Sequence, residues 1–274
     1  MPAILSNRKR PDTGLMVLRI FVAAFFIFLL APILIVVLYS VSDAAYTVWP
    51  IQDLSLRWYE RMIEYRPFLT SLGFSFKVAI WAAALSILIG VPAALALARS
   101  RSPLAEAVTT FLLAPLSMPM ILLGVALLYY FSWMGLGVSQ TGVILSHTVV
   151  SLPYIVRTVA AVYMNAGKGQ EESAAILGAN RVQVFVRVTL PMIRAGILAG
   201  GIFAMLISLD NLPISFFFAG PDTNTLPVVM LAYQQNQFDP AIAAISTTQM
   251  VIAIAMLLVV QRLTGLHHII GQQR

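Results

Sequence analysis

The sequence predicts an all-α fold, a polytopic membrane protein with six transmembrane helices. Of its 274 residues, 59% are hydrophobic and only 10% are charged, whereas charged residues make up about a quarter of a typical soluble domain. Long apolar runs recur along the chain, each close to the roughly 20 residues that a helix needs to cross a hydrocarbon core of about 30 Å. Helices satisfy their own backbone hydrogen bonds in lipid, so each run is expected to be a helix.

Six apolar runs have the length and composition of membrane spans. In order, they lie at roughly Leu15–Val41, Leu69–Ala98, Val108–Phe131, Gly142–Tyr163, Ala195–Ala219 and Ala241–Leu263. Residues 1–14 are then an N-terminal tail, and residues 15–274 are expected to form one transmembrane domain. The intervening stretch Ser42–Pro67 carries several Trp and Tyr residues, which favour the headgroup level, so we expect an external loop with a surface-lying piece there.

The distribution of basic residues predicts the orientation of the spans. With the N-terminus inside, thirteen of the 17 Lys and Arg residues belong to the inner side and four to the outer side. The inner set is Arg8, Lys9, Arg10, Arg19, Arg99, Arg101, Arg157, Lys168, Arg181, Arg187, Arg194, Arg262 and Arg274. The outer set is Arg57, Arg61, Arg66 and Lys77. Because cytoplasmic loops carry the excess of Lys and Arg, both termini are expected in the cytoplasm.

Several classes of function are disfavoured by what the sequence lacks. It has no cysteine, so neither a disulfide framework nor a thiolate metal site can form. It has no phosphate-binding Gly-x-x-x-x-Gly-Lys-Ser/Thr motif, no His/Glu pair with the spacing of a zinc hydrolase and no Gly-x-Ser-x-Gly elbow. Its basic residues are spread between the apolar runs and form no nucleic-acid-binding patch. We therefore predict no enzyme, no metal site and no cofactor.

The expected cytoplasmic loop, residues 164–194, begins with a short helix. Glu171 and Glu172 lie where a helix N-terminus favours negative charge, strong helix formers follow, and Gly178 suits a helix C-terminus. A second helical stretch, roughly Arg181–Thr189, is expected to end before Pro191, because a residue that precedes proline disfavours the helical conformation. The two stretches form a helix-turn-helix elbow, and small side chains in its first half would let a partner approach the backbone closely.

The same loop resembles the signature of the permease subunits of bacterial ABC importers: Glu-Ala-Ala, three residues, Gly, nine residues, Ile-x-Leu-Pro. The residues that match this pattern with its spacing intact are Glu172, Ser173, Ala174, Gly178, Val188, Leu190 and Pro191. Ser173 stands for the first alanine and Val188 for isoleucine, and both replacements are conservative in size. The resemblance implies a type I importer (MetI-like) fold in which this loop is the coupling helix, seated in a cleft of an ATP-binding subunit. The residues assigned to that contact are Glu171, Glu172, Ser173, Ala174, Gly178, Leu190 and Pro191.

The resemblance also implies partners, location and solute. The partners are two ATP-binding subunits that hydrolyse ATP, a second permease subunit that is a distinct related chain, and a periplasmic solute-binding protein; the location is the bacterial inner membrane. Three segments look like the spermidine/putrescine branch: Leu56–Tyr59, Ser208–Phe217 and Phe238–Thr247. The implied solute is a polyamine, and other small solutes (amino-acid-like, an opine or a phosphonate) are alternatives. A self-contained secondary transporter is disfavoured, because the two halves show no convincing repeat.

Asp210 lies near the middle of the fifth expected span, where a charged side chain costs about 2.5–3.5 kcal/mol on insertion scales. At about 100° per residue, Ser208, Asn211 and Ser215 fall along one face of a helix. Pro213 removes a helix hydrogen bond and can loosen the turn that contains Asp210. We predict a substrate path lined by Ser208, Asp210, Asn211 and Ser215, with a carboxylate suited to a cationic amine. The alternative is that Asp210 ties helices together or pairs with a residue of the partner permease.

Other polar and small residues within the spans suggest structural roles. His147 in the fourth span is expected to form an interhelical hydrogen bond, a common contact in helix bundles. Gly196 and Gly200 form a small-xxx-small pair that favours close helix packing. Pro115 and Pro119 are expected to kink the third span.

Overall fold

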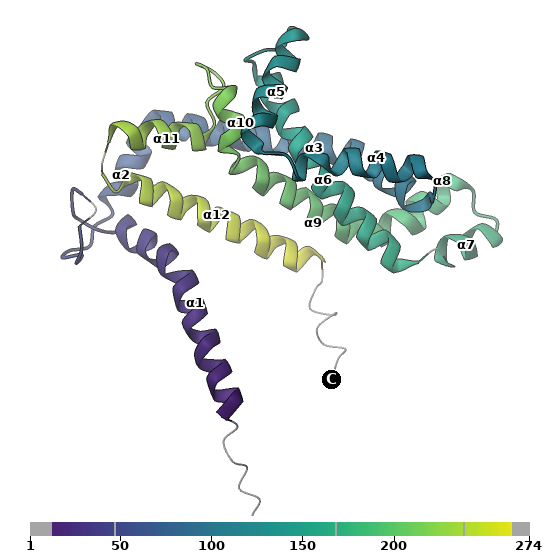
Figure 1. Cartoon of the computed structure of the whole chain (residues 1–274), viewed down its shortest axis with the longest axis horizontal. Coiled ribbons are helices and arrows are strands. Elements are labelled where there is room, and N and C mark those ends of the chain that lie inside the picture. The colour runs from purple at the N-terminus through teal and green to yellow at the C-terminus, as the bar shows by residue number, and fades with distance from the viewer. Residues whose placement is uncertain (1–12, 47, 168, 238, 265–274) are drawn as a thin grey trace, which may run out of the picture. The chain divides into compact units, whose positions relative to one another are not determined.

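Figure 1 shows the computed structural model, which describes residues 13–46, 48–167, 169–237 and 239–264. The helices are α1 (Thr13–Ser40), α2 (Arg57–Glu64), α3 (Arg66–Arg99), α4 (Pro103–Leu113), α5 (Met120–Trp133), α6 (Gln140–Ala166), α7 (Gly169–Ile176), α8 (Arg181–Val184), α9 (Leu190–Leu209), α10 (Leu212–Phe217), α11 (Leu226–Asn236) and α12 (Ala241–Thr264). A 3-10 turn, η1 (Ala114–Leu116), follows α4, and a π-helical turn, η2 (Phe185–Thr189), joins α8 to α9. Among the described residues the β pairing is one bridge between Ser42 and Leu54. The expected all-α fold is confirmed.

Some expectations concern residues that the structure does not describe. The predicted tail at 1–14 lies outside the described residues except for its last two positions. The same is true of the inner basic residues Arg8, Lys9, Arg10, Lys168 and Arg274. The single transmembrane domain over 15–274 stays a prediction. The described residues divide into two compact units: the first lies within Met1–Met62 and Phe238–Thr248, and the second lies within Ile63–Gln237 and Gln249–Arg274.

Within the described residues, five helical runs are long and apolar enough to cross a membrane, and a bent helix pair makes a sixth candidate. The five are Gly14–Ser40, Arg66–Arg99, Gln140–Ala166, Arg181–Leu209 and Ala241–Val259. Four of them coincide closely with expected spans, and the number of spans agrees with six when the bent pair is counted as one.

The third expected span, Val108–Phe131, is not one straight helix. Pro103–Leu116 and Met120–Trp133 meet at a bend of 107°. Pro115 and Pro119 flank this bend, each without a backbone N–H to continue a helix, and Met118 precedes a proline. The kinks expected at these prolines are present, and their combined effect is larger than expected.

The fifth expected span, Ala195–Ala219, is displaced along the chain. The helical run begins at Arg181, ends at Leu209 and resumes as α10. The side chain of Asn211 accepts a hydrogen bond from the backbone N–H of Ile214 at 3.1 Å and so caps α10, with Pro213 in the first turn. An N-cap with a proline in the first turn after it favours the start of a new helix, which explains why the apolar sequence does not continue as one helix.

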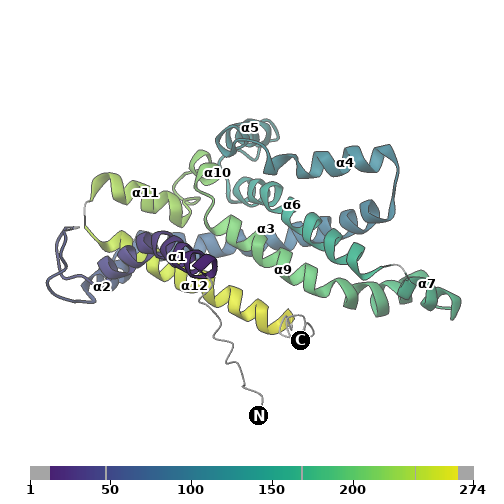
Figure 2. The same ribbon diagram turned by 60° about the horizontal axis from the view of Figure 1, so that its bottom comes forward.

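The core of the second unit consists of α3, α6 and α9, which pack against one another. One cluster of buried side chains joins these three helices, with Ile155, Val159 and Ile193 at its centre. A second cluster joins α3 and α6 to α5 and α10 through Val78, Val143 and other apolar residues. In both Figure 1 and Figure 2, α7 lies at the end of this unit that is remote from α11.

Glycines allow α9 to approach α6 closely. A Cβ atom added at Gly200 would lie 3.2 Å from Cδ1 of Ile155, and one at Gly196 would lie 3.1 Å from Cγ2 of Val162. Both distances are tighter than ordinary van der Waals contact, so a larger residue would push the helices apart. The packing role predicted for this glycine pair is confirmed.

The first unit comprises α1, the following loop, most of α2 and the start of α12. The hydroxyl groups of Ser40 and Tyr59 share a hydrogen bond of 2.9 Å between the end of α1 and α2. Arg57 forms an ion pair with Asp43 at 3.4 Å and lies over the ring of the buried Trp58, 4.5 Å from its centroid. The stretch between the first two expected spans thus contains the short helix α2, and its position on the membrane surface stays a prediction.

Candidate coupling site and substrate path

The first half of the predicted elbow is the helix α7, and it ends in a well-defined cap. Gly178 has φ of +87°, the left-handed conformation that glycine adopts readily. Its N–H donates to the carbonyl of Ala175 at 3.0 Å, and the N–H of Ala179 donates to that of Ala174 at 3.1 Å. This pair of bonds is a Schellman motif, which satisfies carbonyl groups that a helix end otherwise leaves free.

The second half of the elbow starts at Asn180 and does not stop where the sequence predicted. The Asn180 side chain accepts from the N–H of Gln183, and the Gln183 side chain accepts from the N–H of Asn180, both at 2.9 Å, which is a capping box. The helical run then passes through η2 into α9, so the expected end before Pro191 is wrong. The N–H of Leu190 bonds to the carbonyl of Phe185, five residues earlier, and this wider turn accommodates the proline.

The outer surface of the elbow is exposed, including large apolar side chains. Ile176 and Leu177, at the capped end of α7, are 86% and 87% exposed. Glu172 and Ser173 are also exposed, and Ala174 is half-buried. Leu190 and Pro191, which the sequence analysis grouped with them, are exposed residues at the start of α9 rather than parts of α7.

Glu171 differs from its neighbours because its side chain, only 14% exposed, faces the membrane helices. One carboxylate oxygen, Oε1, accepts from Nη2 of Arg99 at 2.7 Å and from the hydroxyl of Thr189. The other oxygen, Oε2, accepts from the hydroxyl of Tyr163 at 2.8 Å. Nε of Arg99 donates to the same Tyr163 oxygen at 2.8 Å. The four side chains thus form one hydrogen-bonded cluster, which we call the Glu171 cluster.

Electrostatics keep the carboxylate of this cluster ionised. Burial by itself raises the pKa of Glu171, but the hydrogen bonds from Thr189, Tyr163 and Arg99 and the charge of Arg99 outweigh burial, and the pKa is lowered from its ordinary value. No motif in the sequence pointed to Arg99, Tyr163 or Thr189 as members of a site. Arg99 and Tyr163 each lie at the inner end of an expected span, and this shared position was the one feature of the sequence that could have indicated that they lie close together.

The predicted polar stripe is largely buried in contacts within the chain. Nδ1 of His147 lies 2.8 Å from Oγ of Ser208, and its Nε2 lies 3.1 Å from Oγ of Ser215. All three residues are buried, so the interhelical hydrogen bond predicted for His147 is confirmed twice over. One histidine thereby connects α6 to both sides of the break between α9 and α10. Asn211 is also buried and uses its side chain as the cap of α10.

Asp210 occupies the break between α9 and α10 and is the exposed member of the predicted path set. Its backbone N–H ends α9 by bonding to the carbonyl of Leu206 at 3.2 Å. Its carboxylate forms no hydrogen bond or ion pair with the part of the chain that the structure describes. An exposed carboxylate without a bond to these residues is compatible with both roles predicted for Asp210, which are lining a path and pairing with the partner permease.

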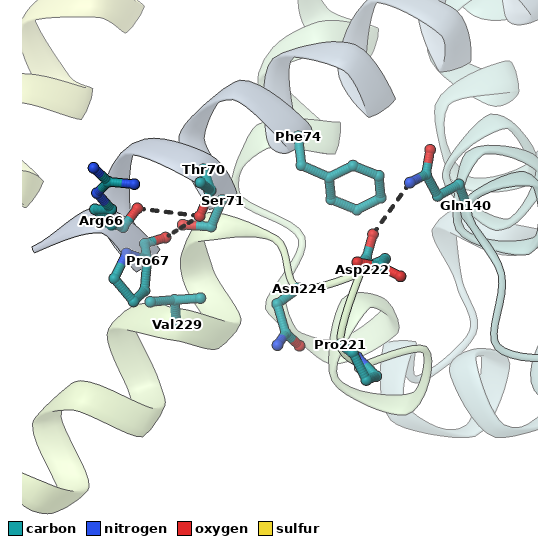
Figure 3. Close-up of a pocket in the computed structure, with 10 residues that line it drawn as sticks. All are labelled: Arg66, Pro67, Thr70, Ser71, Phe74, Gln140, Pro221, Asp222, Asn224 and Val229. Carbon is teal, nitrogen blue, oxygen red and sulfur yellow. Dashed lines mark hydrogen bonds between the residues drawn. The ribbon is translucent and has the colours of Figure 1, made fainter.

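A pocket of about 540 Å³ lies where α3 and α6 begin, at the end of the second unit opposite the Glu171 cluster (Figure 3). Its polar lining includes Arg66, Gln140 and Asp222, and the amide of Gln140 donates to the carbonyl of Asp222 at 3.4 Å. Nζ of Lys77 donates to the same amide group, to its oxygen, at 2.7 Å. Both charge signs are present in this region, so the pocket does not select a solute by charge alone. No motif in the sequence pointed to this pocket.

Known proteins resemble this chain over most of its length. Residues 86–268 match the family described as binding-protein-dependent transport system inner membrane component. The molybdenum transport system permease protein ModB of Mycobacterium tuberculosis is 37% identical over 205 residues, which cover 69% of this chain and 76% of ModB. The putrescine transport system permease protein PotI of Escherichia coli K12 is 31% identical over 230 residues, 81% of each chain.

Solved structures share the fold at low sequence identity. A chain of a bacterial ABC transporter that imports the acidic polysaccharide alginate has a TM-score of 0.71 at 17% identity, with coverage of 96% of this chain and 99% of that one. A chain of the MetNI methionine ABC transporter in an inward-facing conformation has a TM-score of 0.62 at 15% identity, with coverage of 75% and 97%. The expected type I importer fold is therefore confirmed. With two thirds of its length matched by the family and relatives above 30% identity, the chain belongs to the binding-protein-dependent transport system inner membrane components.

Proposed function

We propose that this chain is the permease subunit of an ATP-driven importer and that α7 is its contact with a separate ATP-binding subunit. The observation that carries the proposal is the exposure of Ile176 and Leu177 at the capped end of a helix that lies outside the expected spans. Apolar side chains on a loop in water favour a protein partner. Glu172, Ser173 and Ala174 lie on the same helix, and their short or polar side chains allow close approach.

The partners follow from the proposed role. Two ATP-binding subunits supply the hydrolysis for which this chain has no phosphate-binding loop, a second permease chain completes the path, and a periplasmic binding protein delivers the solute. The excess of basic residues on the α7 side supports cytoplasmic termini in a bacterial inner membrane. ATP binding closes the ATP-binding subunits, α7 moves with them, and the spans open toward the binding protein.

The experiment replaces Leu177 with glutamate. Full burial of a Leu side chain contributes about 1.5–3 kcal/mol, so Leu177→Glu should weaken binding of the ATP-binding subunit by about 10- to 100-fold. The measurement is the Kd for binding of the ATP-binding subunit to the purified permease chains. Val138→Glu is a matched control, because Val138 is also an exposed apolar residue, 52% exposed, on a loop between helices remote from α7. Equal affinity in both variants would remove α7 as the docking site.

The solute that we propose is a small cationic polyamine such as spermidine or putrescine. PotI matches over 81% of the chain, and the spermidine/putrescine permease PotC of Escherichia coli K12 matches over 88% at 25% identity. The exposed carboxylate of Asp210 at the helix break suits a cation. The identity of 37% with ModB favours a second candidate, an oxyanion such as molybdate.

The binding protein that works with this permease separates the two solute classes. Bound ligand raises a protein's melting temperature by mass action, by an amount that grows with ligand concentration over Kd. Thermal shift with spermidine, putrescine and molybdate should show stabilisation by a polyamine and none by molybdate. Stabilisation by molybdate alone would overturn the polyamine assignment and leave the importer assignment intact.

A further inference from the structure

The two adjacent acids of α7 face in different directions. Successive residues of a helix are separated by about 100°, and the structure turns Glu172 outward while it turns Glu171 inward with 14% of its side chain exposed. The outward acid is available to a partner protein. The inward acid already has its partners within this chain, so the two residues cannot serve the same purpose.

The partners of Glu171 come from each of the three helices that form the core of the second unit or lead into it. Arg99 is the last residue of α3, Tyr163 lies in the last turn of α6, and Thr189 is the last residue of η2, directly before α9. Helices α3, α6 and α9 are the ones that pack against one another along the unit. A single carboxylate therefore connects α7 to all three.

The bonding pattern makes this connection firm and directional. Both carboxylate oxygens are used, three donors converge on them, and Arg99 closes a ring by also donating to Tyr163. Hydrogen bonds that involve charged groups are shorter and about twice as strong as neutral ones. Tyr163 itself is buried, and its ring lies 5.2 Å from the Arg99 guanidinium carbon. By contrast, Gly167 before α7 and Gly178 after it are exposed and have positive φ.

We propose that Glu171 is a positioning residue that anchors α7 to α3, α6 and α9, so that displacement of α7 by the ATP-binding subunit reaches the membrane helices through this carboxylate. The inference rests on the proposed role of α7 as the docking helix and adds how its movement is transmitted. It also gives a different role to Glu171, which the sequence had led us to group with the residues that contact the ATP-binding subunit, although the signature itself begins at Glu172.

The test uses the complete transporter in proteoliposomes, with its ATP-binding subunits and binding protein, and measures ATP hydrolysed per solute imported. Three near-isosteric variants each weaken the Glu171 cluster: Glu171→Gln, Tyr163→Phe and Thr189→Val. We expect each variant to raise the ratio of ATP hydrolysed to solute imported, with Glu171→Gln raising it about fivefold or more, the lower range of typical coupling between sites. Because Glu171→Gln and Thr189→Val act on the same bond, the double variant should show less than the product of the two single effects.

Glu106→Gln is the matched control, since Glu106 is an exposed acid of α4 whose carboxylate has no bond to the described residues. A merely structural role for the Glu171 cluster would lower the melting temperature of the complex and leave the ratio of ATP to solute at its parental value, which would overturn the proposal. The proposal would also be overturned if Glu171→Gln weakened binding of the ATP-binding subunit as much as Leu177→Glu does. If Leu177→Glu has no effect on affinity, the docking role fails instead, and the two failures are distinguishable.

Discussion

At the residue scale, hydrogen bonding decides which members of the polar stripe can meet a solute. Ser208 and Ser215 each form a hydrogen bond with one ring nitrogen of His147, and Asn211 caps α10. A buried polar group that loses its partner costs about 1–3 kcal/mol, so recruiting these three for a solute would carry that penalty. The carboxylate of Asp210 forms no hydrogen bond with the described residues, so it is the strongest candidate for contact with a solute.

Asp210→Asn removes the charge at nearly constant volume. If the carboxylate meets a cation, import should fall by about 10- to 100-fold, since hydrogen bonds to charged groups contribute about 1.5–3 kcal/mol. The measurements are uptake and the yield of assembled complex in the membrane. Asp53→Asn, an exposed acid in the loop after α1, is the control. If Asp210 instead pairs with a basic residue of the partner permease, the yield collapses along with uptake, and parental uptake at normal yield would remove both roles.

At the scale of elements, the elbow is held from both sides by local bonds. The Schellman motif at Gly178 ends α7, and the capping box at Asn180 starts α8 two residues later. Together they fix the direction in which the chain leaves α7. The continuous run from Arg181 to Leu209 then joins the elbow to the membrane interior without a hinge at Pro191. The predicted coupling region is thus a hydrogen-bonded turn followed by a continuous helical run.

Gly178→Val should disrupt this turn. A left-handed conformation costs an L-residue about 1–2 kcal/mol, and a β-branched side chain more, although no neighbouring atom would obstruct the added Cβ. We expect solute-stimulated ATP hydrolysis to fall by about fivefold or more in Gly178→Val. Gly178→Asn should retain most of it, because asparagine tolerates the left-handed region. Equal activity in the two variants would show that the turn does not depend on this conformation.

At the scale of the whole molecule, the arrangement of spans places two kinds of site at opposite ends of the second unit. The Glu171 cluster lies at the ends of α3 and α6, and the pocket around Arg66 and Gln140 lies at their beginnings. α3 alone has 34 residues, which at about 1.5 Å per residue is long enough to span a bilayer. We therefore expect the two ends to face different compartments.

Topology can be measured with a reporter that is active only in the periplasm. Fusions after Asp53 and Asp222 should be active, and a fusion after Gly169 should be silent, because the basic residues concentrate on the side of α7. Expression of each fusion, followed through an epitope, controls for degradation. Activity after Gly169 together with silence after Asp53 would show the opposite orientation in the membrane. That result would contradict the contact of α7 with a cytoplasmic ATP-binding subunit.

The sequence by itself determined the features that depend on local chemistry. Apolar runs of sufficient length specify helices in lipid. The spacing from Glu172 through Gly178 to Pro191 identified the family, and the role of this segment as the coupling helix stays a prediction. Tertiary structure decided what each polar side chain contacts. Glu171 meets Arg99 from 72 residues away, and His147 meets Ser208 from 61 residues away. Such pairings depend on how α3, α6 and α9 pack, and no local pattern encodes which face of a short helix turns inward.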